Sequence, residues 1–76
     1  MRKQRSIYPN LEAELTRYKI PKMSLSKTLG INNITLYRKI RGETPFTLEE
    51  AKAIRLTLEI KTNEKFTLDY LFQESV

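Results

Sequence analysis

Several kinds of residue are missing from this chain of 76 residues, and each absence excludes a class of function. There is no cysteine, so the sequence offers neither a disulfide framework nor a thiolate metal site. There is no histidine, which removes the commonest general base and the commonest metal ligand. No apolar run approaches the roughly 18 residues of a membrane span, and none follows the basic N-terminus as a signal peptide requires. We therefore expect a cytoplasmic protein, not an enzyme, without metal, cofactor, small-molecule ligand or membrane contact.

Positive charge is concentrated in the first half of the chain. Residues 1–42 hold ten Lys or Arg against two Glu, a net charge of +8. Residues 43–76 hold four Lys or Arg against seven acids, a net charge of −3, which leaves +5 for the whole chain. A polyanion would meet the basic half and be repelled by the other half. Uneven charge is common in small domains, so its weight here comes from the motif that lies in the basic half.

Residues 22–41 predict two short helices joined by a tight turn. Gly30 stands where the first helix ends and a left-handed backbone is required, and Asn32 is a good N-cap for the second. Leu36 and Ile40 repeat at i, i+4 and face inward. The opposite side of the same helix collects Asn33, Ile34, Tyr37, Arg38 and Arg41. A helix held by its back while it shows Asn and Arg to the outside is typical of a DNA major-groove reader.

The remainder of the chain predicts further helices with short connections. Thr47 and Glu50 have the spacing of a capping box, which marks the start of the fourth helix. The expected helices cover about 9–18, 22–29, 33–41, 47–60 and a short stretch from 67 or 68. The buried face of the fourth helix is expected to comprise Leu48, Ala51, Ile54, Arg55 and Leu58. The fold class is therefore all-α, with a flexible basic arm over 1–7, one folded domain over 8–73 and a tail over 74–76.

Four segments give the chain a resemblance to a known family. They are Tyr-Pro-Asn-Leu-Glu-Ala-Glu-Leu at 8–15, Thr-Leu-Tyr-Arg-Lys-Ile-Arg-Gly at 35–42, Phe-Thr-Leu-Glu-Glu-Ala at 46–51 and Asp-Tyr-Leu-Phe at 69–72. With five helices and the motif at the second and third, the chain resembles the Cro-like phage repressor family over about residues 8–73, small prophage-type regulators above all. The resemblance implies a compact five-helix bundle of the phage-repressor type with a helix-turn-helix. It also implies a sequence-specific transcriptional regulator, associated with the nucleoid in the cytoplasm of a bacterial host cell, that represses by occluding a promoter.

The chain departs from the pattern of that family at three positions around the second helix. Pro21 stands where a Ser or Thr N-cap is usual, and Lys22 stands where a Gln is common. Lys can anchor a phosphate, but it cannot accept a hydrogen bond as Gln can. Ser26 replaces the usual Ala where the two helices cross, and it is still small enough for close packing. These departures bear on the details of base readout rather than on the fold.

The resemblance assigns roles to residues around the third helix. Asn33 would pair with the N6 and N7 edge of adenine, Ile34 would touch a thymine methyl, and Arg38 would reach guanine or a phosphate. Solvation of the helix or a second capping contact is the alternative for Asn33, and incidental exposure is the alternative for Ile34. Tyr37 is the fourth candidate for base contact, with burial against the second helix as its alternative. The expected phosphate contacts are Lys22, Ser24, Asn32, Thr35, Lys39, Arg41 and Thr44, with a solvated charge on the flank as the alternative for Lys39. The candidates for an arm in the minor groove, with a disordered tail as the alternative, are Arg2, Lys3 and Arg5.

The predicted phosphate contacts set the expected salt dependence of DNA binding, and the resemblance sets the expected operator and oligomeric state. If about six phosphates are neutralised, log affinity falls with log salt at a slope of roughly −5. Members of the family usually bind two-fold sites, so the expected partner is an inverted-repeat operator bound by a homodimer that forms in solution or only on DNA. Tyr70 and Val76 are the candidate interface residues, with ordinary core packing as the alternative for this stretch. The alternative function is a protein-interaction module on the same fold, antirepressor or antitoxin-like, without specific DNA binding.

Overall fold

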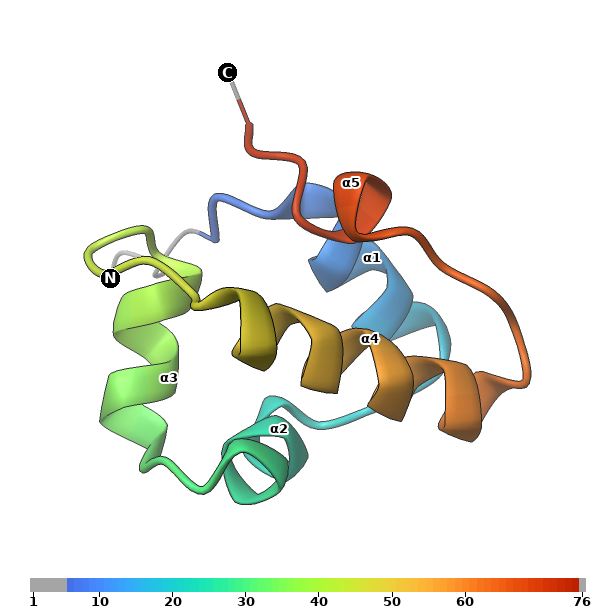
Figure 1. Cartoon of the computed structure of the whole chain (residues 1–76), viewed down its shortest axis with the longest axis horizontal. Helices are drawn as coiled ribbons and strands as arrows, with labels where there is room; N and C mark the ends of the chain where they lie inside the picture. The colour runs from blue at the N-terminus through green and yellow to red at the C-terminus, as the bar shows by residue number, and fades with distance from the viewer. Residues whose placement is uncertain (1–5, 76) are drawn as a thin grey trace.

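Five α-helices lie within residues 6–75, the part of the chain that the computed structural model describes (Figure 1). They are α1 (Pro9–Arg17), α2 (Lys22–Leu29), α3 (Asn33–Ile40), α4 (Leu48–Thr62) and α5 (Leu68–Leu71). No strand occurs among these residues, so the predicted all-α class with five helices is confirmed. Each predicted helix lies within about two residues of the observed one, because the predicted ends rest on caps and helix breakers. Within residues 6–75, every helix is too short or too polar to cross a membrane.

The ends of the helices are set by the residues that the sequence places there. Gly30 has a φ of 71°, the left-handed conformation that ends α2. Asn32 Oδ1 accepts a hydrogen bond from the N–H of Thr35 at 2.8 Å and caps α3. At α4, Thr47 Oγ1 accepts from the N–H of Glu50 at 3.0 Å, while Glu50 Oε1 accepts from the N–H of Thr47 at 2.9 Å. The predicted N-cap and capping box are therefore confirmed.

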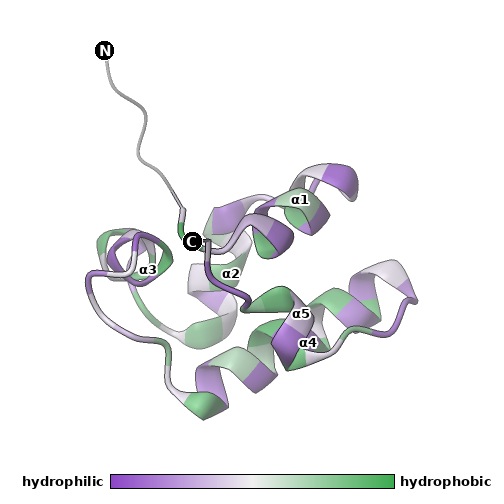
Figure 2. Ribbon diagram, turned by 90° about the horizontal axis from the view of Figure 1, so that it is seen from above, coloured by the Kyte–Doolittle hydropathy of each residue, from purple (hydrophilic) through white to green (hydrophobic). Residues whose placement is uncertain are grey.

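The core gathers apolar side chains from all five helices. α4 packs against α2 and α5, α5 also packs against α1, and α2 packs against α3. Figure 2 shows hydrophobic and hydrophilic residues interleaved along the helices, and it shows α3 nearly end-on at one edge of the molecule. The buried apolar residues are Tyr8, Leu11, Leu15, Ile20, Leu25, Leu36, Ile40, Ile54, Leu58 and Leu71. Because α3 sits at an edge, it supplies the core from one side only.

Two expectations about the edges of the core are wrong. Leu48 was expected on the buried face of α4, but it is the first residue of that helix and is 62% exposed. Ile7 was expected in the arm, but it belongs to the folded part. Its N–H donates to the Ile40 carbonyl at 3.0 Å, its carbonyl accepts from the N–H of Ser75 at 2.8 Å, and its side chain packs on the core. Burial of this large apolar side chain beside Tyr8 favours the ordered conformation.

Candidate nucleic-acid interface

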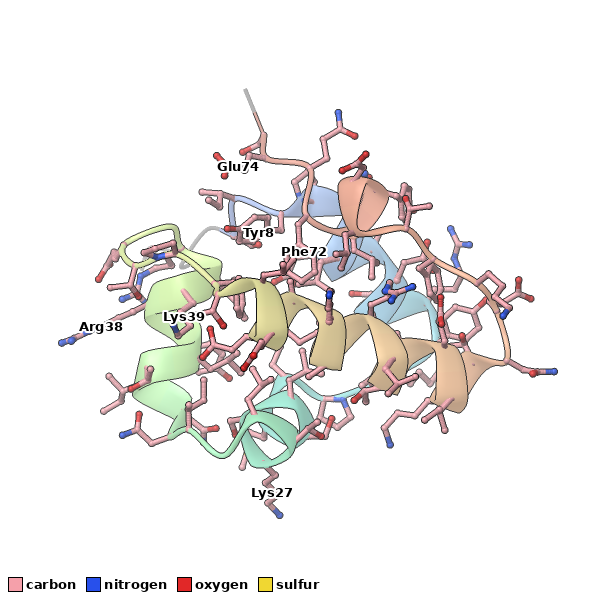
Figure 3. The ribbon with its side chains drawn as sticks, in the orientation of Figure 1. Tyr8, Lys27, Arg38, Lys39, Phe72 and Glu74 are labelled. Carbon is pink, nitrogen blue, oxygen red and sulfur yellow. The ribbon has the colours of Figure 1, made fainter. Side chains whose placement is uncertain are left out.

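The two faces of α3 have opposite surroundings. Leu36 is fully buried and Ile40 is nearly so, which fixes the inner face against the core. On the other face Ile34 is 67% exposed, and Tyr37 and Arg38 are exposed as well. Figure 3 shows Arg38 pointing away from the molecule on the outer side of α3. The outer face therefore presents an apolar, an aromatic and a cationic side chain to any partner.

The turn between α2 and α3 is short and firmly bonded. The N–H of Gly30 donates to the Lys27 carbonyl at 3.2 Å, and the N–H of Ile31 donates to the Ser26 carbonyl at 3.0 Å. The side chain of Ile31 packs against the core. A Cβ at Gly30 would meet nothing within 4 Å, so glycine is required there by its positive φ and not by lack of space. These contacts hold α2 and α3 in one fixed relation.

Asn33, the first residue of α3, is anchored on α2. The Ser26 Oγ lies 2.7 Å from Asn33 Oδ1 and also 2.7 Å from the Met23 carbonyl oxygen. Ser26 is 5% exposed and Asn33 is half-buried, so this contact is sheltered from water. From the sequence, Ser26 was expected only to allow close packing by its small size, and this contact was not predicted. The signal was present, since a Ser at a helix crossing brings a hydroxyl that a buried site must pair.

Lys39 lies on the inner flank of α3 and faces α4 (Figure 3). Its Nζ is 3.1 Å from Glu50 Oε1 and donates to the Pro45 carbonyl at 3.1 Å, and its side chain is 12% exposed. Burial tends to raise the pKa of Glu50, but the hydrogen bond from the Thr47 backbone and the Lys39 ammonium outweigh it and lower that pKa. A cation held in this way would have to break an ion pair to reach a phosphate. We therefore remove Lys39 from the expected phosphate contacts.

Lys22, at the start of α2, and Arg41, directly after α3, each have a carboxylate partner. Lys22 Nζ is 2.8 Å from Glu12 Oε2, and Arg41 Nε donates to Glu43 Oε2 at 2.9 Å. The hydrogen bond from Arg41 lowers the pKa of Glu43 against the opposing effect of desolvation, and the charges of Arg41 and Arg38 lower it further. The Glu43 side chain is 53% exposed, and an exposed carboxylate pair contributes little free energy, so Arg41 can exchange Glu43 for a phosphate at small cost. The Lys22 pair is half-buried, and Glu12 Oε2 is a buried atom that has no other partner within residues 6–75, so transfer of Lys22 to a phosphate costs more.

The remaining predicted polar contacts lie at helix ends and in the loop after α3. Ser24, in the first turn of α2, donates its hydroxyl to the Pro21 carbonyl at 2.7 Å. The amide oxygen of Asn32 is engaged in the cap, which leaves its NH₂ group as a donor. Thr35 is half-buried in the first turn of α3, and Thr44 is exposed in the loop that leads to α4. The structure thus leaves Asn32, Thr35 and Thr44 as peripheral donors, whereas the hydroxyl proton of Ser24 is already used in its bond to Pro21.

Unpaired positive charge remains at two described positions near the motif. Within residues 6–75, neither Arg38 nor Lys27 forms an ion pair. Lys27, in the last turn of α2, was not among the predicted contacts, and Figure 3 shows it pointing away from the molecule. The predicted arm residues Arg2, Lys3 and Arg5 lie outside the described residues. Arg38 is thus the one predicted base-contacting cation, and within residues 6–75 it forms no ion pair, although its charge acts on Glu43.

Tyr70, a predicted interface residue, is tied to its own chain. Its hydroxyl donates to Glu14 Oε2 at 2.7 Å, and its ring stacks on Phe66 with centroids 6.5 Å apart. The hydrogen bond to Glu14, with some desolvation, raises the pKa of Tyr70. Glu14 is buried, so this bond pairs its Oε2 atom, whereas within residues 6–75 its Oε1 atom has only the Arg17 guanidinium at 3.8 Å. A role of Tyr70 between subunits stays a prediction, and Val76 lies outside the described residues.

No family model, curated protein or solved structure matches the chain. Within residues 6–75, no three acidic side chains come together in a way that could hold a metal ion. The outer face of α3 and the side chains around it are therefore the features from which a function can be inferred.

Proposed function

We propose that the chain is a sequence-specific, double-stranded DNA-binding transcriptional regulator whose α3 enters the major groove. In this proposal α2, residues 30–32 and α3 form a helix-turn-helix within a bundle of the phage-repressor type. The observation that carries the proposal is the division of α3, which buries Leu36 and Ile40 and leaves Ile34 and Arg38 free. An α-helix about 10–12 Å across fits a major groove about 12 Å wide.

The outer face of α3 would read base edges. The guanidinium of Arg38 has the fork geometry that matches O6 and N7 of guanine, and it can also bind a phosphate. The side chain of Ile34 would pack on a thymine methyl, and Tyr37 would contact a base methyl with its ring or a phosphate with its hydroxyl. Asn33 would hydrogen-bond a base at the point where α3 enters the groove.

Phosphate contacts would flank this face and fix the register of α3. Lys22 and Ser24 lie at the start of α2, where the free N–H groups and the helix dipole favour an anion. Arg41 and Thr44 follow α3, and Asn32 and Thr35 lie at its start. If Lys22, Arg38 and Arg41 neutralise three phosphates, the salt slope is about −3 rather than −5. A steeper slope would indicate that cations outside residues 6–75 join the contact.

Repression by promoter occlusion is the mechanism that such a small domain suits best. Occlusion requires only that the bundle formed by residues 6–75 covers its site on the DNA. One monomer reads only a few base pairs, so a homodimer on an inverted repeat would be needed, with half-sites about 34 Å apart. Phage or prophage regulators in a bacterial cytoplasm are the class that the resemblance implies.

In vitro selection from a random duplex pool at about 0.15 M salt tests the proposal. We expect a short inverted repeat to be enriched, and Arg38→Ala to relax particular positions of that repeat. Lys52→Ala, which removes an exposed charge from α4, is the matched control and should leave the repeat unchanged. Salt-sensitive binding without an enriched sequence would indicate an architectural role, and absence of duplex binding would overturn the proposal.

One observation favours the alternative, a protein-interaction module of the antirepressor or antitoxin type. α4 exposes Leu56 and Ile60 on successive turns, and exposed apolar side chains at this spacing suit a protein partner. The two functions are distinguished by the same selection. An interaction module would enrich no duplex, and substitution of Arg38 would not affect its binding to a protein partner.

A further inference from the structure

The contact between Ser26 and Asn33 poses a question of proton count. The Ser26 Oγ lies 2.7 Å from two carbonyl-type oxygens, those of the Met23 backbone and of the Asn33 side chain. Both distances are ordinary for O–H···O hydrogen bonds. A serine hydroxyl carries one proton, so it can donate to only one of the two oxygens. The other oxygen would then face Ser26 with no proton between them.

A half-turn of the Asn33 amide about its terminal side-chain bond removes this conflict. The oxygen and nitrogen of an amide are nearly equal in size, so the exchange leaves the packing unchanged. The Nδ2–H of Asn33 then donates to Ser26 Oγ, and the Ser26 hydroxyl donates to the Met23 carbonyl. Every polar atom of the contact is then paired, which matters because Ser26 is buried.

We propose that Ser26 is a positioning residue that holds the Asn33 amide with its oxygen outward, so that Asn33 accepts a hydrogen bond from an amino group of a base. The proposal rests on the proposed DNA-binding function. In the major groove, adenine offers its N6 amino group and cytosine its N4 amino group, whereas guanine O6 and N7 and thymine O4 only accept. An outward amide oxygen would therefore favour adenine or cytosine over guanine or thymine on the contacted strand.

The amide oxygen of Asn32, the neighbouring asparagine, is engaged differently from that of Asn33. The amide oxygen of Asn32 faces the backbone of Thr35 and caps α3 at 2.8 Å, so it is not free to accept from a base. Asn33 stands one residue later, and its side chain meets Ser26. Without the Ser26 hydroxyl, the Asn33 amide could present either its oxygen or its nitrogen, because rotation about its terminal bond is broad. The selectivity for an amino group thus depends on a residue of α2 that does not itself contact the base.

The first test is a comparison of base preference. Asn33→Ala identifies the position of the selected repeat that Asn33 reads, because that position loses its preference. At this position we expect the wild-type protein to favour adenine or cytosine about tenfold over guanine or thymine. Ser26→Ala should reduce this preference to about twofold or less, since the amide then turns freely. Retention of the full preference by Ser26→Ala would overturn the positioning role.

Thr28→Ala is the matched control for the loss of a hydroxyl from α2. Thr28 is exposed, and its Oγ1 donates to the Ser24 carbonyl at 3.0 Å without contact to Asn33. We expect this variant to keep the wild-type preference. Ser26→Ala also preserves a small side chain at the helix crossing, and an unchanged thermal midpoint confirms that it folds.

The second test needs no DNA. In NMR spectra of the free, ¹⁵N-labelled protein, we expect nuclear Overhauser contacts between the Asn33 side-chain NH₂ protons and the Ser26 β-protons. NH₂ protons that point away from Ser26 would overturn the proposal whatever the selection shows. If the contacts are present but no variant enriches any duplex, the proposed function fails. The base-reading claim then fails with it, and only the hydrogen bond remains.

Discussion

Ile34 and Leu36 belong to one helix, are two positions apart and have side chains of similar size, yet their surroundings are opposite. Leu36 is fully buried on the inner face of α3, and Ile34 is largely exposed on the outer face. Arg38 and Lys39 show the same division for cations, because Arg38 points outward and Lys39 is paired with Glu50 between α3 and α4. The difference teaches that stability and proposed recognition are assigned to separate faces of α3. Substitutions should therefore separate the two properties.

The largest expected effect comes from the apolar pair. Leu36→Ala should lower the free energy of unfolding by about 3 kcal/mol, because it removes buried apolar atoms and leaves a cavity. Ile34→Ala should change it by less than about 0.5 kcal/mol. Chemical denaturation of both variants measures the difference. Equal losses of stability would contradict the division of the two faces.

Arg38 and Lys39 should differ in which property depends on them, DNA affinity or stability. Arg38→Ala should weaken binding to a selected duplex by about 1–3 kcal/mol and leave stability nearly unchanged. Lys39→Met keeps much of the aliphatic stem but leaves Glu50 without its cation, so it should lower stability by about 1 kcal/mol and affect binding little. Affinity and denaturation are measured for both variants. The reverse assignment, with Lys39 governing affinity, would show that its ion pair opens on DNA.

The two glycines that bound α3 extend the comparison to its ends. Both have a positive φ, so substitution by Ala costs about 1–2 kcal/mol at either site. At Gly42 a Cβ would also lie 2.8 Å from Ile7 Cδ1, whereas at Gly30 nothing lies within 4 Å. We therefore expect Gly42→Ala to lower the thermal midpoint more than Gly30→Ala. An equal or smaller loss at Gly42 would mean that Ile7 moves aside freely.

The smallest expected effect concerns the ion pair of Arg41 with Glu43. Glu43→Gln removes a negative charge near α3 and replaces one of the two acceptor oxygens by an NH₂ group, so it should raise DNA affinity slightly. Because the pKa of Glu43 is lowered in the folded protein, the stabilising contribution of this pair is present above the ordinary carboxyl pKa and is lost as the pH falls below it. Wild-type stability should therefore fall slightly more than that of Glu43→Gln between about pH 5 and pH 3. Parallel pH profiles of the two proteins would show that the pair contributes nothing.

The helices and their ends could be predicted because they depend on neighbouring residues. The cap at Asn32, the capping box at Thr47 and the left-handed Gly30 all involve residues within four positions of each other. The inward repeat of Leu36 and Ile40 likewise follows from the helical period. Patterns of this kind can be read from the sequence because they depend only on residues close to one another in the chain.

The features that could not be predicted depend on contacts between distant segments. The pairing of Lys39 with Glu50 requires the orientation of α4 relative to α3, which no local pattern gives. The packing of Ile7 and the exposure of Leu48 depend on where the core ends. Counting charges along the sequence therefore overestimates the positive charge available on the outer surface of α3.

The measurement that tests the central claim most directly is an NMR titration of the ¹⁵N-labelled protein with duplex DNA. If the outer face of α3 binds DNA, the largest shift changes will fall on residues 32–38 and on the Arg38 side chain. Leu56 and Ile60, on the free face of α4, should shift little. Changes centred on Leu56 and Ile60, or none on α3, would contradict the account.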